Sequence, residues 1–134
     1  MNNKQISNDP KNQINEPGVQ RDIHKRIYEF VVTVIKITRL LQRNPENQVF
    51  INQILRSATS VGANDQEADA AESRKDFIAK YSIVKKELKE TGYWLRLIEE
   101  CNQSINNDIK LIRNESEELL HIVSKIIINT KNKS

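Results

Sequence analysis

Apolar residues recur along most of the chain with the spacing of α-helices. From residue 21 onward they return every three or four positions, which keeps them on one side of a helix at about 100° per residue. The pattern is interrupted at Asn44–Pro45, at Ser73, and between Cys101 and Asn107. It therefore predicts four helices, over 21–43, 46–71, 74–101 and 107–130. Short connections between them predict an all-α fold, an antiparallel up-down-up-down four-helix bundle.

The two ends of the chain lack this pattern. Residues 1–20 are rich in Asn and Gln and are predicted to form a disordered tail. The bundle domain is predicted over 21–130, and residues 131–134 form a polar C-terminal tail. Within the domain, Pro45 disfavours helix in the residue before it and so ends the first helix. Ser73 and Asp76 have the spacing of a capping box, which predicts a helix start at Arg74.

The first predicted helix has a wide apolar face. Its core positions are Ile23, Ile27, Phe30, Val34, Ile37 and Leu41. Tyr28, Val31 and Ile35 widen that face to roughly half of the helix surface. Two interpretations stay open: either the bundle buries this helix deeply, or the extra arc contacts another subunit.

The second predicted helix contains small residues and one misplaced charge. Its apolar face comprises Ile51, Ile54, Leu55, Ala58, Val61 and Ala68. Small side chains over Ser57–Ala63 predict a tight crossing with a neighbouring helix, which would offset the cost of Gly62 in a helix interior, about 1 kcal/mol. Asp65 falls on the apolar face, and the pattern does not explain it.

The third predicted helix has two apolar stripes. The first comprises Phe77, Tyr81, Val84, Leu88, Leu95 and Ile98, and the second comprises Ile83, Trp94, Leu97 and Cys101. Two stripes suggest one neighbour inside the bundle and one outside it. The candidate residues of an oligomer interface are therefore Tyr28, Ile35, Ile83, Trp94 and Leu97. The fourth helix has one face: Ile109, Ile112, Leu119, Leu120, Val123, Ile126 and Ile127.

Composition excludes several classes of protein. A single cysteine, Cys101, permits no intrachain disulfide and favours a cytoplasmic location. We expect no signal peptide, and no apolar run approaches the roughly 20 residues of a membrane span. His24 and His121 are the two histidines. Glu118 and His121 have the Glu-x-x-His spacing of a di-iron bundle once, whereas such a site needs it twice. With no phosphate-binding loop either, we predict no cofactor, no metal and no enzymatic activity.

Basic side chains form two stripes, and the formal net charge is +3. Five of them fall within roughly 60° of arc on the first helix, namely Arg21, Lys25, Lys36, Arg39 and Arg43. The third helix contributes a second set, Arg74, Lys85, Lys89 and Arg96. Such stripes can follow the charges of a nucleic-acid backbone, although the solvated side of any amphipathic helix looks the same. In a symmetric oligomer each stripe repeats, which strengthens the nucleic-acid interpretation.

Arg56 is a candidate for a structural ion pair. It shares one side of the second helix with Glu67, too far along the axis for the two to bond. Glu87 and Glu90 lie near the second stripe of the third helix. Arg56 either meets one of these carboxylates across helices or subunits, or is an ordinary surface residue.

An ordered set of motifs resembles the bacterial four helix bundle protein family, also called the 23S rRNA-intervening sequence protein family. The motifs are Gln53–Asn64 (QILRSATSVGAN), Glu67–Ala68, Ala71–Phe77 (AESRKDF), Val84–Glu87 (VKKE) and Glu90–Leu95 (ETGYWL). The resemblance extends over about 22–129. It implies a four-helix bundle, commonly a homopentameric barrel. The accessory variability proteins of diversity-generating retroelements look like relatives, and they are basic pentamers that bind nucleic acid and a reverse transcriptase.

The leading hypothesis is a non-catalytic, homo-oligomeric bacterial bundle, a pentamer, that binds RNA or DNA through its basic helix faces. The alternative is a protein–protein scaffold or an accessory subunit, for example of a reverse transcriptase, with no direct contact to nucleic acid. Neither hypothesis involves a membrane or a small-molecule substrate.

Overall fold

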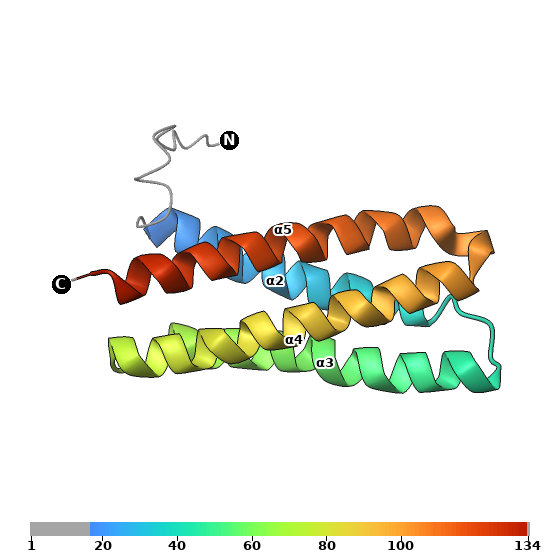
Figure 1. Cartoon of the computed structure of the whole chain (residues 1–134), viewed down its shortest axis with the longest axis horizontal. Helices are drawn as coiled ribbons and strands as arrows, with labels where there is room; N and C mark the ends of the chain where they lie inside the picture. Colours follow the sequence, from blue (N-terminus) through green and yellow to red (C-terminus); the bar gives the residue numbers. More distant parts are fainter. Residues whose placement is uncertain (1–16, 134) are drawn as a thin grey trace.

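The computed structural model describes residues 17–133, with side chains from residue 23 onward, and contains four antiparallel helices in one bundle (Figure 1). The helices are α2 (Pro17–Thr38), α3 (Pro45–Asp69), α4 (Arg74–Cys101) and α5 (Asn106–Lys131). A short 3-10 helix, η1 (Gln103–Ile105), precedes α5. The all-α four-helix bundle that the sequence predicts is confirmed.

Each helix packs against two neighbours in the order α2, α3, α4, α5, and α5 closes the ring by packing on α2. The contact between α3 and α4 is the most extensive and the contact between α2 and α5 the least. Therefore α2 and α4 lie diagonally across the bundle, as do α3 and α5. The start of α2 and the end of α5 lie at the same end of the bundle (Figure 1).

The core contains the apolar faces that the sequence predicts. All six core positions of the first predicted helix are buried. The other helices contribute Ile51, Ile54, Ala58, Val61, Ala68, Tyr81, Val84, Leu88, Leu95, Ile98, Ile109, Ile112, Leu119, Val123 and Ile127. Within residues 17–133, no helix combines the length and apolar character that crossing a membrane requires.

Side-chain caps begin two of the helices. The Asn44 side chain accepts a hydrogen bond from the Asn47 backbone N–H at 2.8 Å, and Pro45 occupies the first turn of α3. Ser73 Oγ accepts the Asp76 N–H at 3.0 Å and starts α4 at Arg74, as predicted. These caps satisfy donors that the first turn of a helix leaves unpaired.

The bounds of the first helix differ from the prediction. The helix begins at Pro17, so residues 17–20 of the predicted tail are helical, and residues 1–16 lie outside the described part. It ends at Thr38, so the predicted continuation to Arg43 is wrong. The chain tightens there, because the Arg39 and Leu40 N–H groups donate to carbonyls three residues back, at 3.1 and 2.9 Å. Leu41 is nevertheless buried, which is why the apolar period seemed to continue.

The small residues of α3 mark a close crossing with α2. A Cβ added to Gly62 would lie 3.3 Å from Val31 Cγ2, closer than ordinary side-chain contacts allow. The tight crossing predicted from Ser57–Ala63 is confirmed at Gly62, where the partner is α2, whereas Ser57 at the start of this stretch faces α4.

Candidate functional site

The basic residues of α2 form a shorter stripe than the sequence predicts. Lys25 and Lys36 are exposed on the helix. Arg39 and Arg43 are also exposed, but they follow Thr38, the last residue of α2. The five-residue arc predicted on one helix is wrong for these two arginines, and the Arg21 side chain lies outside the described residues.

The basic residues of α4 remain on one continuous helix. Lys85, Lys89 and Arg96 are exposed along it. Arg74 is also exposed, but its Nη1 donates to the backbone carbonyl of Lys133 at 2.5 Å, which joins the start of α4 to the end of α5. Because α2 and α4 are diagonal, the two basic sets face away from each other in one subunit.

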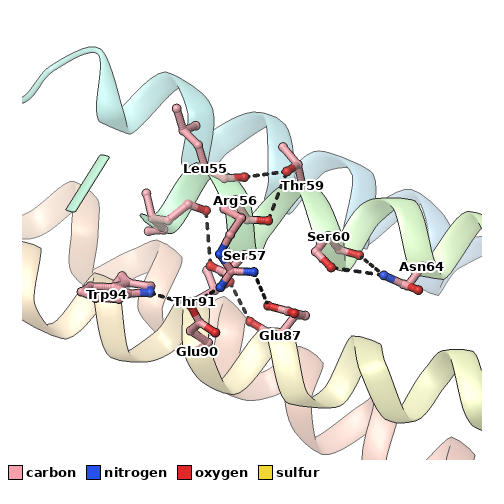
Figure 2. A network of polar contacts seen from close by, with 11 residues as sticks. Leu55, Arg56, Ser57, Thr59, Ser60, Asn64, Glu87, Glu90, Thr91 and Trp94 are labelled. Carbon is pink, nitrogen blue, oxygen red and sulfur yellow. Dashed lines mark hydrogen bonds and ion pairs between the residues drawn. The ribbon is translucent and has the colours of Figure 1, made fainter. Parts of the chain in front are cut away.

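Arg56 joins α3 to α4 within one subunit (Figure 2). Its guanidinium donates to Glu90 and lies 3.6 Å from Oε1 of Glu87. Trp94 Nε1 donates to the same Glu90 carboxylate at 3.1 Å, so Glu90 receives donors from both helices. These hydrogen bonds, that from Arg56 first, hold the pKa of Glu90 below its usual range. Glu67 pairs instead with Lys80, at 2.8 Å.

The interior beside Arg56 is polar. Ser57 and Thr91 face each other across the two helices with hydroxyl oxygens 2.8 Å apart, both fully buried. Glu87 is only 8% exposed, and its Oε1 accepts no hydrogen bond from the described residues. The Arg56 ion pair therefore offsets the cost of a buried carboxylate.

A second polar cluster explains Asp65 and joins three helices. Asp65 is 1% exposed, and its carboxylate lies 2.8 and 2.9 Å from Nδ1 of His24 on α2. Tyr81 of α4 donates its hydroxyl to Asp65 Oδ1 at 2.6 Å. The outer nitrogen of His24, Nε2, lies 3.2 Å from Asp69. The apparent misfit of Asp65 on an apolar face is thus the centre of a network in the bundle interior.

The electrostatics of this cluster favour a charged imidazole. The hydrogen bond to Asp65 raises the pKa of His24 above its ordinary value, although burial opposes it, and Asp69 adds to the rise. Burial and the nearby Asp65 charge raise the pKa of Tyr81, so its hydroxyl stays protonated and donates. From the sequence, His24 was a candidate only for catalysis or metal binding. Its contacts with Asp65 and Asp69 depend on how α2 packs on α3, which the sequence pattern does not show.

Comparison with known proteins places this geometry in a family. The model of the 23S rRNA-intervening sequence protein family matches residues 20–125. The chain belongs to the 23S rRNA-intervening sequence protein family. A solved structure from Bacteroides thetaiotaomicron, described as a protein of unknown function from the S23 ribosomal protein family, is 36% identical with a TM-score of 0.73. That match covers 81% of this chain and 97% of the other. No protein of curated function matches significantly.

The apolar side chains considered for an oligomer interface differ in exposure in this member of the family. Tyr28 is 67% exposed and Ile83 is 38% exposed. Ile35, Trp94 and Leu97 are half-buried. Trp94 packs inside the subunit on Phe50 of α3, with ring centroids 6.4 Å apart.

Two surface hollows accompany these side chains. Tyr28 borders a groove of about 390 Å³ between α2 and α3, with Gly62 and Ala63 in its wall. A groove of about 440 Å³ separates α2 from α5, and Leu40 and Leu111 at its rim are largely exposed. Leu40 and Leu111 could not be found from the sequence, because neither lies on a predicted apolar face.

The candidates for catalysis and metal binding are dispersed over the fold. Cys101 is exposed at the end of α4, and His121 is exposed on α5. Glu118 contacts Arg26 of α2, which also binds Glu115 at 2.8 Å. Among the residues that the structure describes, no three His, Cys, Asp or Glu side chains gather as metal ligands would.

Proposed function

We propose that this protein is a homo-oligomeric, non-catalytic bundle that binds RNA or DNA through its basic helix faces, and that α4 provides the main face. The observation that carries the proposal is the imbalance of free charge on α4. Glu87 and Glu90 are occupied by Arg56, and Glu99 is bound by Arg113 at 2.7 Å. The exposed cations Lys85, Lys89 and Arg96 take part in none of the ion pairs found among residues 23–133. Their field is available to a polyanion.

Self-association is supported by apolar surface on two neighbouring faces. Tyr28 borders the groove between α2 and α3, and Ile83 lies on α4 between Lys80 and Glu87, both of which pair with residues of α3. Two different patches that face in different directions favour a head-to-tail contact, which generates a ring when the rotation between subunits closes. A ring is consistent with the pentameric barrel that the resemblance implies, and it would repeat the α4 face around the assembly.

The nucleic-acid proposal is tested by gel retardation and fluorescence anisotropy with RNA and DNA at low salt. We expect binding that weakens steeply as salt rises, because counterions are released. The double variant Lys85→Gln/Lys89→Gln should bind several-fold more weakly. Its matched control, Lys110→Gln/Lys125→Gln, removes two exposed cations of α5 and the same net charge. Equal loss in both variants, or no binding by the wild type at low salt, would contradict the proposal.

The assembly is tested by light scattering coupled to size exclusion. A mass of several subunits that falls in the variant Tyr28→Ser or Ile83→Ser supports the ring. A monomer at every protein concentration would contradict it, and the basic face of α4 would then not be repeated around an assembly.

A scaffold without nucleic-acid contact is the second candidate, and the groove between α2 and α5 favours it. Leu111 is 71% exposed there, which suits an apolar side chain of a partner protein such as a reverse transcriptase. Under this hypothesis, Leu111→Ser would abolish partner binding, whereas Lys25→Gln/Lys36→Gln would not. Loss of partner binding in the lysine variant would contradict the scaffold.

A further inference from the structure

Tyr93 stands exposed among the basic side chains of α4. It is 51% exposed, and it lies in the stretch of the helix that contains the unpaired cations. Lys89 precedes it by four residues and Arg96 follows it by three, so both are its neighbours on the helix surface. Lys86 lies one further turn toward the N-terminus on the same side. The aromatic ring of Tyr93 thus lies on the same side of α4 as three exposed cations.

The ring of Tyr93 is held in place by contacts inside the subunit. It makes an edge-to-face contact with Trp94, with centroids 5.1 Å apart and planes inclined by 69°. Trp94 is itself fixed, because its ring packs on Phe50 and its Nε1 donates to Glu90. Half of the Tyr93 side chain remains open to solvent. A ring already restricted in this way loses little conformational freedom when something stacks on it.

The acidic residues of α4 limit this surface without cancelling it. Glu90, three residues before Tyr93, accepts hydrogen bonds from Arg56 and Trp94. Glu100, two helical turns after Tyr93, is exposed and marks the C-terminal limit of the positive surface. Between Lys86 and Arg96 the charge offered to solvent is therefore positive.

On the basis of the nucleic-acid binding proposed above, we propose that the α4 surface around Tyr93 is a binding site for single-stranded nucleic acid. Tyr93 stacks on a base, and Lys86, Lys89 and Arg96 bind the phosphates beside it. Duplexes offer phosphates but keep their base faces covered by neighbouring pairs, whereas a single strand offers both. An exposed aromatic residue among cations is therefore useful chiefly to a single strand. RNA and DNA share this chemistry, and parallel measurements with both distinguish them.

The test compares a labelled single-stranded RNA, its DNA counterpart and the DNA duplex, each bound by the full-length protein at low salt. Anisotropy should show tighter binding of the single strands than of the duplex. Tyr93→Ala should weaken single-strand binding about tenfold while duplex binding stays unchanged. Tyr93→Phe retains the ring and should bind like the wild type. Trp94 is the only tryptophan in the chain, so its emission should change when a single strand binds beside it.

The controls separate this site from the general proposal and from assembly. Lys86→Gln/Lys89→Gln should weaken single-strand and duplex binding alike and reduce the salt dependence. Light scattering must give Tyr93→Ala the mass of the wild type, since a changed mass would make Tyr93 an interface residue and overturn the site. Equal single-strand affinity of Tyr93→Ala and wild type also overturns it. If single strand and duplex bind equally well, nucleic-acid binding stands and the stacking site fails, whereas no binding of either overturns both.

Discussion

Nδ1 of His24 lies 2.8 Å from Oδ1 of Asp65, and this contact joins residues 41 positions apart on α2 and α3. The other ring nitrogen faces Asp69, so the imidazole lies between two carboxylates of one helix. Tyr81 completes the interior side of the cluster. One titratable ring therefore contributes to the attachment of α2 to α3.

The stability of the bundle should fall as pH rises through the folded-state pKa of His24. That pKa is raised above the ordinary value of 6.5, so the folded state binds the proton of His24 more tightly than the unfolded chain does. The contribution is fully present below about pH 6.5 and is lost above the raised value. Urea unfolding of wild type and His24→Gln should differ most below about pH 6.5 and converge as the pH rises above the raised pKa. His121→Gln, which replaces the exposed histidine, should follow the wild type at every pH. A constant gap between His24→Gln and wild type would contradict the linkage.

Removal of the Asp65 carboxylate should be among the most damaging single changes. Asp65→Ala leaves the Tyr81 hydroxyl and a partly buried imidazole without their acceptor, which should cost about 2–4 kcal/mol of unfolding free energy. Tyr81→Phe removes one hydrogen bond only and should cost about 1 kcal/mol. Asp69→Ala is the matched control on the exposed side of the ring, and its effect should be small. Chemical denaturation of the three variants measures the order, and a smaller loss for Asp65→Ala than for Asp69→Ala would contradict it.

Gly62 in α3 and Gly92 in α4 should respond oppositely to alanine. Alanine at Gly92 would place its Cβ 3.6 Å from Ser116 Oγ, an ordinary contact, and should stabilise the bundle by about 1 kcal/mol through helix propensity. At Gly62 the same methyl would press on Val31 across the α2–α3 crossing. The propensity gain should be cancelled there or reversed. Thermal unfolding of both variants tests this, and an equal gain at both positions would show that α2 and α3 do not approach closely.

Loss of the Arg56 guanidinium should destabilise the α3–α4 seam modestly. Arg56→Ala leaves the buried Glu87 without a cation, but Arg56 is half exposed and solvent screens the pair, so about 1 kcal/mol is expected. Adding Glu87→Gln to Arg56→Ala should recover part of the loss, because a neutral amide tolerates burial better than a carboxylate. A double variant that is less stable than Arg56→Ala would argue against a charge effect.

The elements that could be predicted are those whose signals lie close together in the chain. Ser73 and Asp76 are three residues apart, and they placed the start of α4 correctly. The end of α2 was missed because Leu41 remains in the core after the helix has stopped at Thr38. Apolar periodicity indicates which residues are buried, but it does not show where a helix ends when burial continues across the following turn.

The buried polar clusters could be predicted only in part, because their partners are distant in the chain. A contact of Arg56 with Glu87 or Glu90 was one of two interpretations that the sequence left open, and the structure places Arg56 in contact with both. Asp65 was noticed as a misfit, but its partner could not be named. Which face of α2 meets α3 depends on the packing of the whole bundle, and His24 is brought to Asp65 only by that packing.

The uneven contacts of α2 also determine how the bundle can open. The contacts of α4 with α3 and with α5 are extensive, whereas α2 meets α5 across a groove near Leu40 and Leu111. Partial opening in proteins begins where the fewest contacts must break, so amide exchange should be faster in α2 than in α4. Lys25 and Lys36 travel with α2 when it moves. Protonation of His24 should therefore affect how firmly α2, with its exposed Lys25 and Lys36, is held against the bundle.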